Sequence, residues 1–170
     1  MLVATLHITL PDGDGNDGLD EYRHFAPILL ALDAMVAVNL WHIRRALKRA
    51  EKGLGAPVPP LYASGVIYKE DPPGEENWCD LYVVMQMGHG DCDRLCAWRI
   101  AELRAAGIEA QPLIKWQKVP KDVMMSMGHP ANMIPDVGVD MVHVQVQWPD
   151  GHIEDPSKLL GMGGNFTNGV

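Results

Sequence analysis

The stretch "GHGDCDRLCAWRIAELRAAGI", residues 88–108, predicts a helix that starts at a cysteine. Apolar side chains recur in it at helical spacing, namely Leu95, Trp98, Ile100 and Leu103. Gly107 is the residue type favoured just beyond a helix C-terminus. We therefore expect a helix over about 91–106 with Cys92 in its first turn. The backbone amides and dipole of a helix N-terminus lower the pKa of a thiol, which favours a reactive Cys92.

The two flanking residues, Asp91 and Asp93, complicate this interpretation. Negative charge beside a thiol disfavours the thiolate, although one of the two carboxylates is also a candidate helix cap. Cys96, one turn later, fits the usual role of cysteine as a small packing residue, and we assign it no function. The polar start of the helix, together with His143 and Asp155 farther along the chain, favours catalysis over packing for Cys92.

A cysteine nucleophile needs a base within reach and a third group that orients the base. The segment "DMVHVQVQW", residues 140–148, alternates strictly and predicts a strand. His143 lies on the face opposite the three valines, together with Met141, Gln145 and Gln147. His143 is therefore the candidate base, and Asp155 on the following segment is the candidate orienting group.

The turn between these segments decides whether the two side chains meet. If residues 149–151 form a three-residue loop with Gly151 in the left-handed conformation, Gln145 lies opposite Asp155. Asp155 then shares the face of His143 and is diagonally displaced from it, close enough for the side chains to bond. A two-residue Asp-Gly turn would shift the register by one and send Asp155 to the valine face. The sequence leaves both turns open.

Three quoted segments, "GDCDRLCAWRIAELRAAGIEAQPL", "VHVQV" and "PDGHIEDPS", together resemble the transglutaminase-like branch of the papain-like cysteine enzymes. The resemblance covers about residues 78–160 and implies a triad of Cys92, His143 and Asp155. One departure is Val144, which stands where an aromatic residue usually follows the histidine.

The papain pattern further implies an oxyanion-binding role for Gln86, which lies six residues before the cysteine. Its side-chain amide would act with the Cys92 backbone amide to stabilise the oxyanion. The residues leave open whether Gln86 lies on a strand or in a loop.

The segments "GDCDRLCAWRIAELR" and "DGHIEDPSKLLGM" resemble the sequences of small transglutaminase-like proteins of tailed bacteriophages. That resemblance implies a location in the host cytoplasm or in an assembled phage particle. It also implies a protein or peptide substrate and, for a virion component, other virion proteins as partners.

Two function hypotheses follow. The first is a cysteine hydrolase or acyltransferase that acts on an amide or ester bond, a cysteine peptidase or amidase among them. The second is a structural or assembly component of a phage virion that uses the fold without required catalysis. The long loop expected over 120–139, which carries several methionines, and the glycine-rich tail at 161–170 would suit docking onto a neighbour.

The rest of the chain predicts a single α+β domain over residues 1–170. We expect an antiparallel sheet of four or five strands packed on the Cys92 helix, as in the papain-like core. A long N-terminal helix over 26–52 covers them. The expected parts are an N-terminal strand-and-helix elaboration at 1–77, a catalytic-type core at 78–160 and a flexible tail at 161–170. The other expected strands are at 2–11, 61–70 and 108–119.

Composition argues against several other classes of protein. A formal net charge of −8 disfavours a nucleic-acid partner. The apolar run at 25–43 contains Asp33, Asn39 and His42 and follows no basic segment, so we expect a buried helix and no membrane partner. Three cysteines cannot all pair within one chain, which favours a reducing compartment.

The chain also lacks the sequence signs of a metal or cofactor site. It contains no CxxC pair and no HxxxH or HxxxxH pair. The segment "DGDGNDG", residues 12–18, resembles a calcium loop only superficially, because the glutamate expected at the twelfth position is missing. We expect neither a metal nor a cofactor.

Overall fold

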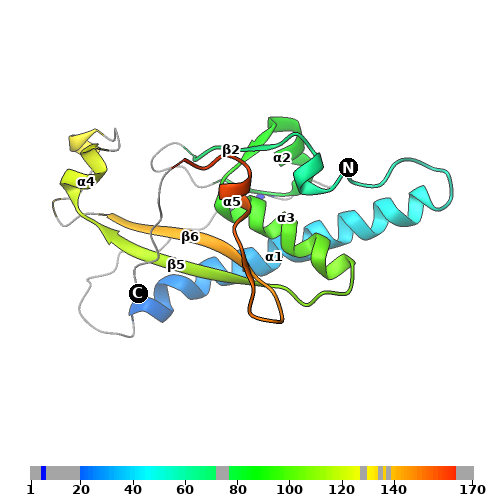
Figure 1. Cartoon of the computed structure of the whole chain (residues 1–170), viewed down its shortest axis with the longest axis horizontal. Coiled ribbons are helices and arrows are strands. Elements are labelled where there is room, and N and C mark those ends of the chain that lie inside the picture. The colour runs from blue at the N-terminus through cyan, green and yellow to red at the C-terminus, as the bar shows by residue number, and fades with distance from the viewer. Residues whose placement is uncertain are drawn as a thin grey trace.

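The computed structural model describes residues 5–6, 20–71, 77–126, 130–133, 136 and 139–163. The chain has a mixed α+β fold with a long N-terminal helix and small sheets (Figure 1). Its main elements are α1 (Asp20–Ala50), α3 (Cys92–Ala105), β5 (Gln111–Val119), β6 (Val139–Gln147) and β7 (Ile153–Glu154). The shorter elements are β1 (Thr5–Leu6), η1 (Leu61–Ala63), β2 (Ile67–Tyr68), β3 (Trp78–Cys79), α2 (Leu81–Met87), β4 (His89–Gly90), α4 (Lys121–Ser126), η2 (Ala131–Met133) and α5 (Pro156–Leu159).

The helix α1 runs along the length of the molecule beneath α3 and the β5–β6 pair (Figure 1). It starts before the predicted residue 26 and ends at Ala50, close to the predicted end. Its buried stripe follows helical spacing and consists of Ile28, Ala31, Leu32, Met35, Val36, Asn39, His42, Ile43 and Ala46. Over Ala26–Ala50, α1 meets the length and composition requirements of a membrane span, as long core helices also do.

The helix α3 is the centre of the fold, since it contacts α1, β6 and α5. The four apolar residues that predict this helix are all buried, which confirms the expected core face. Gly107 follows the helix with φ 83°, a conformation that favours glycine and ends the helix where expected. Cys92 is the first residue of α3, which agrees with its predicted place in the first turn.

The largest sheet in the described part of the chain has three antiparallel strands in the order β5-β6-β7. The expectation of four or five strands in one sheet was therefore wrong. Two further pairs are separate and very short: β1 with β3, antiparallel, and β2 with β4, parallel. One reason is that the strand expected at 61–70 is reduced to the two-residue β2, which pairs with β4 and does not join β5-β6-β7. Residues 81–87 form a helix capped by the Asp80 side chain.

The strand β6 separates two faces. Val144 and Val146 belong to the hydrophobic core, together with Leu95 and Cys96 of α3. His143 points to the opposite face by strand alternation, yet it too is buried. The valine face therefore anchors the strand, while the other face carries the buried polar side chains His143 and Gln145 and, at its end, the exposed Gln147.

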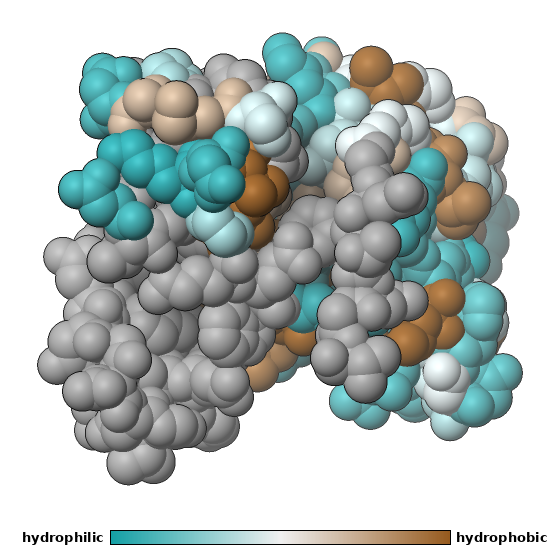
Figure 2. Space-filling view, turned by 60° about the vertical axis from the view of Figure 1, so that its left-hand side comes forward, coloured by the Kyte–Doolittle hydropathy of each residue, from teal (hydrophilic) through white to brown (hydrophobic). Residues whose placement is uncertain are grey.

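Apolar side chains also reach the surface, as with Leu30 and Leu159, which are 72% and 65% exposed. On the face drawn in Figure 2, brown apolar groups of the described residues are separated by teal hydrophilic ones. Scattered exposure of this kind is ordinary for a folded protein.

Several predictions fall partly or wholly outside the described residues. Of the strand expected at 2–11, the structure describes only Thr5–Leu6, and the loop at 12–18 lies outside the description. The segment 120–139 was expected to be a loop, but it contains α4 and η2. Of the tail, residues 164–170 lie outside the described part.

Candidate functional site

The candidate site starts from the hairpin between β6 and β7. The Trp148 amide donates to the His152 carbonyl at 2.8 Å, and the Gly151 amide donates to the Trp148 carbonyl at 3.0 Å. Gly151 has φ 86°, the left-handed conformation that the three-residue loop requires. Of the two turns that the sequence leaves open, the three-residue loop is therefore the one that forms.

This register brings the predicted base and carboxylate together. Val146 pairs with Glu154, so Gln145 lies opposite Asp155 and His143 is diagonal to it. Nε2 of His143 is 2.9 Å from Oδ2 of Asp155. The Gln145 side-chain amide donates to the same oxygen, also at 2.9 Å. His143 and Asp155 are thus directly hydrogen-bonded, in a site where their side chains are only 3% and 12% exposed.

Asp155 has an unusually stable negative charge. Burial opposes its ionisation, but the hydrogen bonds from His143 and Gln145 outweigh burial and lower the pKa of Asp155 to about 2. Its other oxygen accepts the Lys158 amide at 3.2 Å and so caps α5. One carboxylate therefore orients a histidine and starts a helix at the same time.

The charge of Asp155 determines which His143 nitrogen carries a proton. An ionised carboxylate can only accept hydrogen bonds, so Nε2 of His143 donates to it. Nδ1 is then the nitrogen that would exchange a proton with a nucleophile. This arrangement is the one that general-base catalysis by histidine requires.

Of the three thiols, Cys92 is the one that is partly exposed. Cys79 and Cys96 are buried, and burial raises the pKa of both thiols, that of Cys96 strongly. The Cys96 thiol donates to the Val144 carbonyl at 3.1 Å, which agrees with its predicted packing role. Cys92 differs from both in its exposure and in its place at the start of a helix.

The fold partly offsets the negative charge that flanks Cys92, because a buried arginine pairs with Asp91. Oδ1 of Asp91 is 2.9 Å from Nε of the buried Arg94, whose Nη2 is 2.5 Å from Oδ1 of Asp71. Burial, followed by the charge of Asp91 and a hydrogen bond with it, raises the pKa of Asp93 well above its usual value. Asp91 is thus ion-paired and Asp93 is shifted toward its neutral form, so the objection to a thiolate at Cys92 is weaker.

The side chain of the N-cap residue of α3 makes no capping hydrogen bond. Asp91 occupies the N-cap position of α3, but its side chain binds Arg94 instead of a backbone amide. The Asp93 carboxyl accepts the Arg94 amide at 2.6 Å. Capping of the kind expected for one of the two residues is therefore not made by Asp91.

Cys92 begins a helix that packs against the elements of the histidine–carboxylate pair. The helix that it starts contacts β6, which carries His143, and α5, which Asp155 caps. Tyr68 gives a second indication: burial raises the pKa of its hydroxyl, and the nearby Cys92 and Asp155 both raise it further. Cys92 and Asp155 are thus both close enough to the Tyr68 hydroxyl to influence its pKa.

The structure places Gln86 on α2, with an exposed side chain. It is on neither a strand nor a loop, the two alternatives that its sequence context had left open. Its oxyanion role stays a prediction.

Sequence reasoning assigned no role to two residues of this site, Gln145 and Tyr68. The alternation of β6 places Gln145 on the His143 face, which is a signal that could have identified it. Tyr68 enters the region because β2 pairs with β4, so that Tyr68 lies beside Gly90, two residues before Cys92. No sequence pattern predicts that strand pairing.

Among the residues that the structure describes, no group of three or more His, Cys, Asp or Glu side chains is arranged to hold a metal ion. Comparisons with protein-family models, with curated proteins and with solved structures found no match to this chain.

Proposed function

We propose that the chain is a transglutaminase-like cysteine hydrolase or acyltransferase, with a papain-like core, that acts on an amide or ester bond. In this proposal Cys92 is the nucleophile, His143 the general base and Asp155 the orienting carboxylate. The observation that carries it is the 2.9 Å hydrogen bond between His143 and Asp155, made on elements that contact the helix beginning at Cys92.

The proposed reaction has two halves. First, Sγ of Cys92 bonds to the carbonyl carbon while its proton passes to Nδ1 of His143. The carbon–nitrogen or carbon–oxygen bond then breaks, the leaving amine or alcohol takes that proton, and a thioester remains. In the second half, water or an amine attacks the thioester and gives its proton to His143. The carbon–sulfur bond breaks, His143 returns that proton to Sγ, and the Cys92 thiol is restored.

Each residue has a physical reason for its role. The α3 dipole and first-turn amides favour the Cys92 thiolate, and ion pairing of Asp91 with Arg94 reduces the opposing charge. Asp155 stabilises the imidazolium that forms when His143 takes the proton. Gln86, with the Cys92 amide, is carried here as the proposed oxyanion-stabilising group.

Alkylation by iodoacetamide in the native protein tests the nucleophile. We expect rapid labelling at about pH 6, where an ordinary thiol reacts slowly, and loss of that labelling in Cys92→Ala. Cys96→Ala is the matched control and should keep the labelling, since Cys96 is buried. A native protein that is labelled only after denaturation would contradict the proposal.

Peptide-bond hydrolysis and amide transfer share the first half of the reaction. Product analysis with a glutamine-containing peptide, with and without an added primary amine, separates them. An amine adduct identifies acyl transfer, and a carboxylate product identifies hydrolysis. Neither product, together with no labelling of Cys92, would leave the alternative role as a structural or assembly component of a phage virion.

A further inference from the structure

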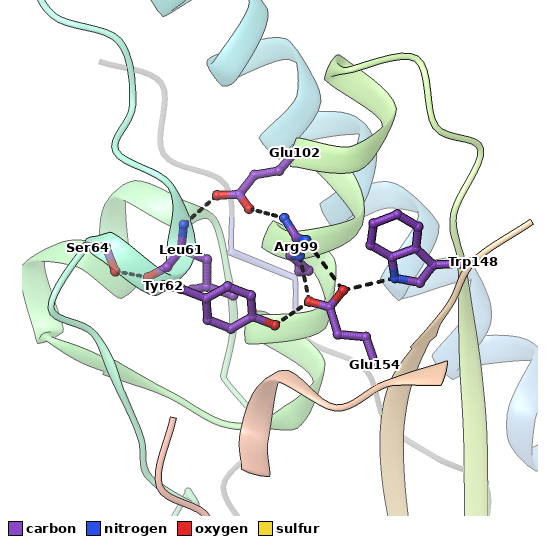
Figure 3. Close-up of polar contacts among 7 residues, drawn as sticks. All are labelled: Leu61, Tyr62, Ser64, Arg99, Glu102, Trp148 and Glu154. Atoms are coloured by element: carbon purple, nitrogen blue, oxygen red, sulfur yellow. Dashed lines mark hydrogen bonds and ion pairs between the residues drawn. The ribbon is translucent and has the colours of Figure 1, made fainter. Parts of the chain in front are cut away.

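Glu154 immediately precedes Asp155 and is held by a dense set of donors (Figure 3). Its Oε1 accepts Nε of Arg99 at 2.6 Å and also the hydroxyl of Tyr62. Its Oε2 accepts Nε1 of Trp148 at 2.9 Å and Nη2 of Arg99 at 3.4 Å. These bonds outweigh the burial of Glu154 and lower its pKa. Glu154 is therefore an ionised, firmly held carboxylate.

The same contacts extend through Arg99. Its Nη1 is 3.1 Å from Oε2 of Glu102, whose Oε1 accepts the Leu61 amide at 2.5 Å. The guanidinium carbon also lies 5.3 Å from the ring centroid of Tyr62 and 5.8 Å from that of Trp148. We call the five side chains Tyr62, Arg99, Glu102, Trp148 and Glu154 the Glu154 network. It joins η1, α3, the residue after β6, and β7 (Figure 3).

Two members of the network are linked closely to the candidate triad. Arg99 is seven residues after Cys92 on α3, which is two helical turns, so both lie on nearly the same side of that helix. Glu154 is bonded through the backbone to Asp155, and side chains alternate along an extended strand. Glu154 therefore points to the network while Asp155 points to His143.

We propose that the Glu154 network positions Asp155 against His143 and fixes both relative to the helix that carries Cys92. The inference rests on the proposed function for its consequence in catalysis, although the positioning of Asp155 is a separate claim. Tyr62, Arg99, Trp148 and Glu154 are positioning residues, since they act through Asp155. The physical reason is that four hydrogen bonds to Glu154 restrict the peptide unit on which the Asp155 carboxylate depends.

The test uses variants that remove donors without changing charge, because loss of Glu154 or Arg99 would alter the site through electrostatics alone. Tyr62→Phe and Trp148→Phe each remove one neutral donor and keep an aromatic ring beside Arg99. Tyr82→Phe and Trp41→Phe are the matched controls, since both residues lie outside the network. The double variant, Tyr62→Phe with Trp148→Phe, should have the larger effect.

Two readouts distinguish positioning from support of the fold. The first is the NMR resonance of the His143 Nε2–H proton, which the bond to Asp155 protects from exchange. We expect it to be lost or to exchange faster in the double variant. The second is the pH profile of Cys92 alkylation, where we expect a rate about threefold to tenfold lower at about pH 6. Thermal unfolding checks that the variants are folded.

The outcomes separate this inference from the proposed function. A folded double variant in which the proton resonance and the alkylation profile are unchanged would overturn the positioning role and leave the proposed function standing. A second outcome combines an unreactive Cys92 in the wild type with loss of the His143 Nε2–H resonance in the double variant. It would support the positioning role and overturn the proposed function. If the double variant does not fold, the single variant Tyr62→Phe is tested by the same two readouts, because residue Tyr62 is 41% exposed and the change removes only one oxygen.

Discussion

Nε2 of His143 and Oδ2 of Asp155 lie 2.9 Å apart, although the two residues are 12 positions apart in the chain. The bond joins β6 to the residue that follows β7 and depends on the hairpin between them. Gln145 donates to the same carboxylate oxygen, so that oxygen is held from two positions on one strand face. The testable consequences concern the carboxylate, the hairpin and the polar groups that hold the surrounding helices.

Removing the carboxylate should slow the chemistry of Cys92 without removing the thiol. We expect Asp155→Asn to lower the rate of Cys92 alkylation at about pH 6 by about 10²-fold, because His143 loses the charge that stabilises its protonated form. The rate constant over a range of pH measures this. Asp150→Asn, at the exposed turn, is the control and should keep the wild-type profile. Equal profiles for Asp155→Asn and wild type would contradict the role of Asp155.

Asp155 should also make the free energy of unfolding depend on pH in the acidic range. Its pKa falls from 3.8 to about 2 on folding, so its ionised form favours the folded state above about pH 4. That contribution, roughly 1–2 kcal/mol, is lost as the pH falls toward 2. Urea unfolding at several pH values should give a difference between wild type and Asp155→Asn that shrinks from pH 5 to pH 2. A difference that does not vary with pH would count against this assignment.

The length of the hairpin loop should matter independently of the three candidate residues. Pro149→Thr combined with Asp150→Asn favours a two-residue Asn-Gly turn at positions 150–151, in which residue 149 pairs with His152 and Asp155 moves to the valine face. We expect the His143 Nε2–H resonance to lose its protection and Cys92 alkylation at about pH 6 to slow by about tenfold or more. Gly151→Asn, which tolerates the left-handed conformation, is the milder control. Retention of the resonance in the shortened loop would contradict the register argument.

Asp80 should stabilise the fold away from the candidate site. Its Oδ1 accepts the amides of Tyr82 and Val83 at 2.9 and 3.2 Å, which caps α2, and its side chain is fully buried beside His42. We expect Asp80→Ala to lower the free energy of unfolding by about 1–3 kcal/mol, and Asp80→Asn to lower it less because the amide oxygen can still cap. Urea denaturation measures both. If both variants lose the same free energy of unfolding, the contact with His42 and not the cap would account for the effect of Asp80.

The helix at residues 92–105 could be predicted because its signals are local. Apolar spacing, the polar start and Gly107 all lie within one short stretch, and each acts through neighbouring residues. The long N-terminal helix and the strand around His143 were predictable for the same reason. The size of the sheet was not, since strand pairing depends on residues far apart in the chain, and those near 61–90 form two-residue pairs and a helix instead.

The sequence by itself determined the helix that begins at Cys92, the polar face of the strand that carries His143, and the two possible positions of Asp155. Periodicity acts over a few residues, so one sequence suffices to read it. Only the tertiary structure decided which turn forms, that Arg94 pairs with Asp91, and that Arg99 reaches Glu154 across 55 positions. These contacts depend on how separate elements pack, and buried polar groups take partners wherever the fold brings them together.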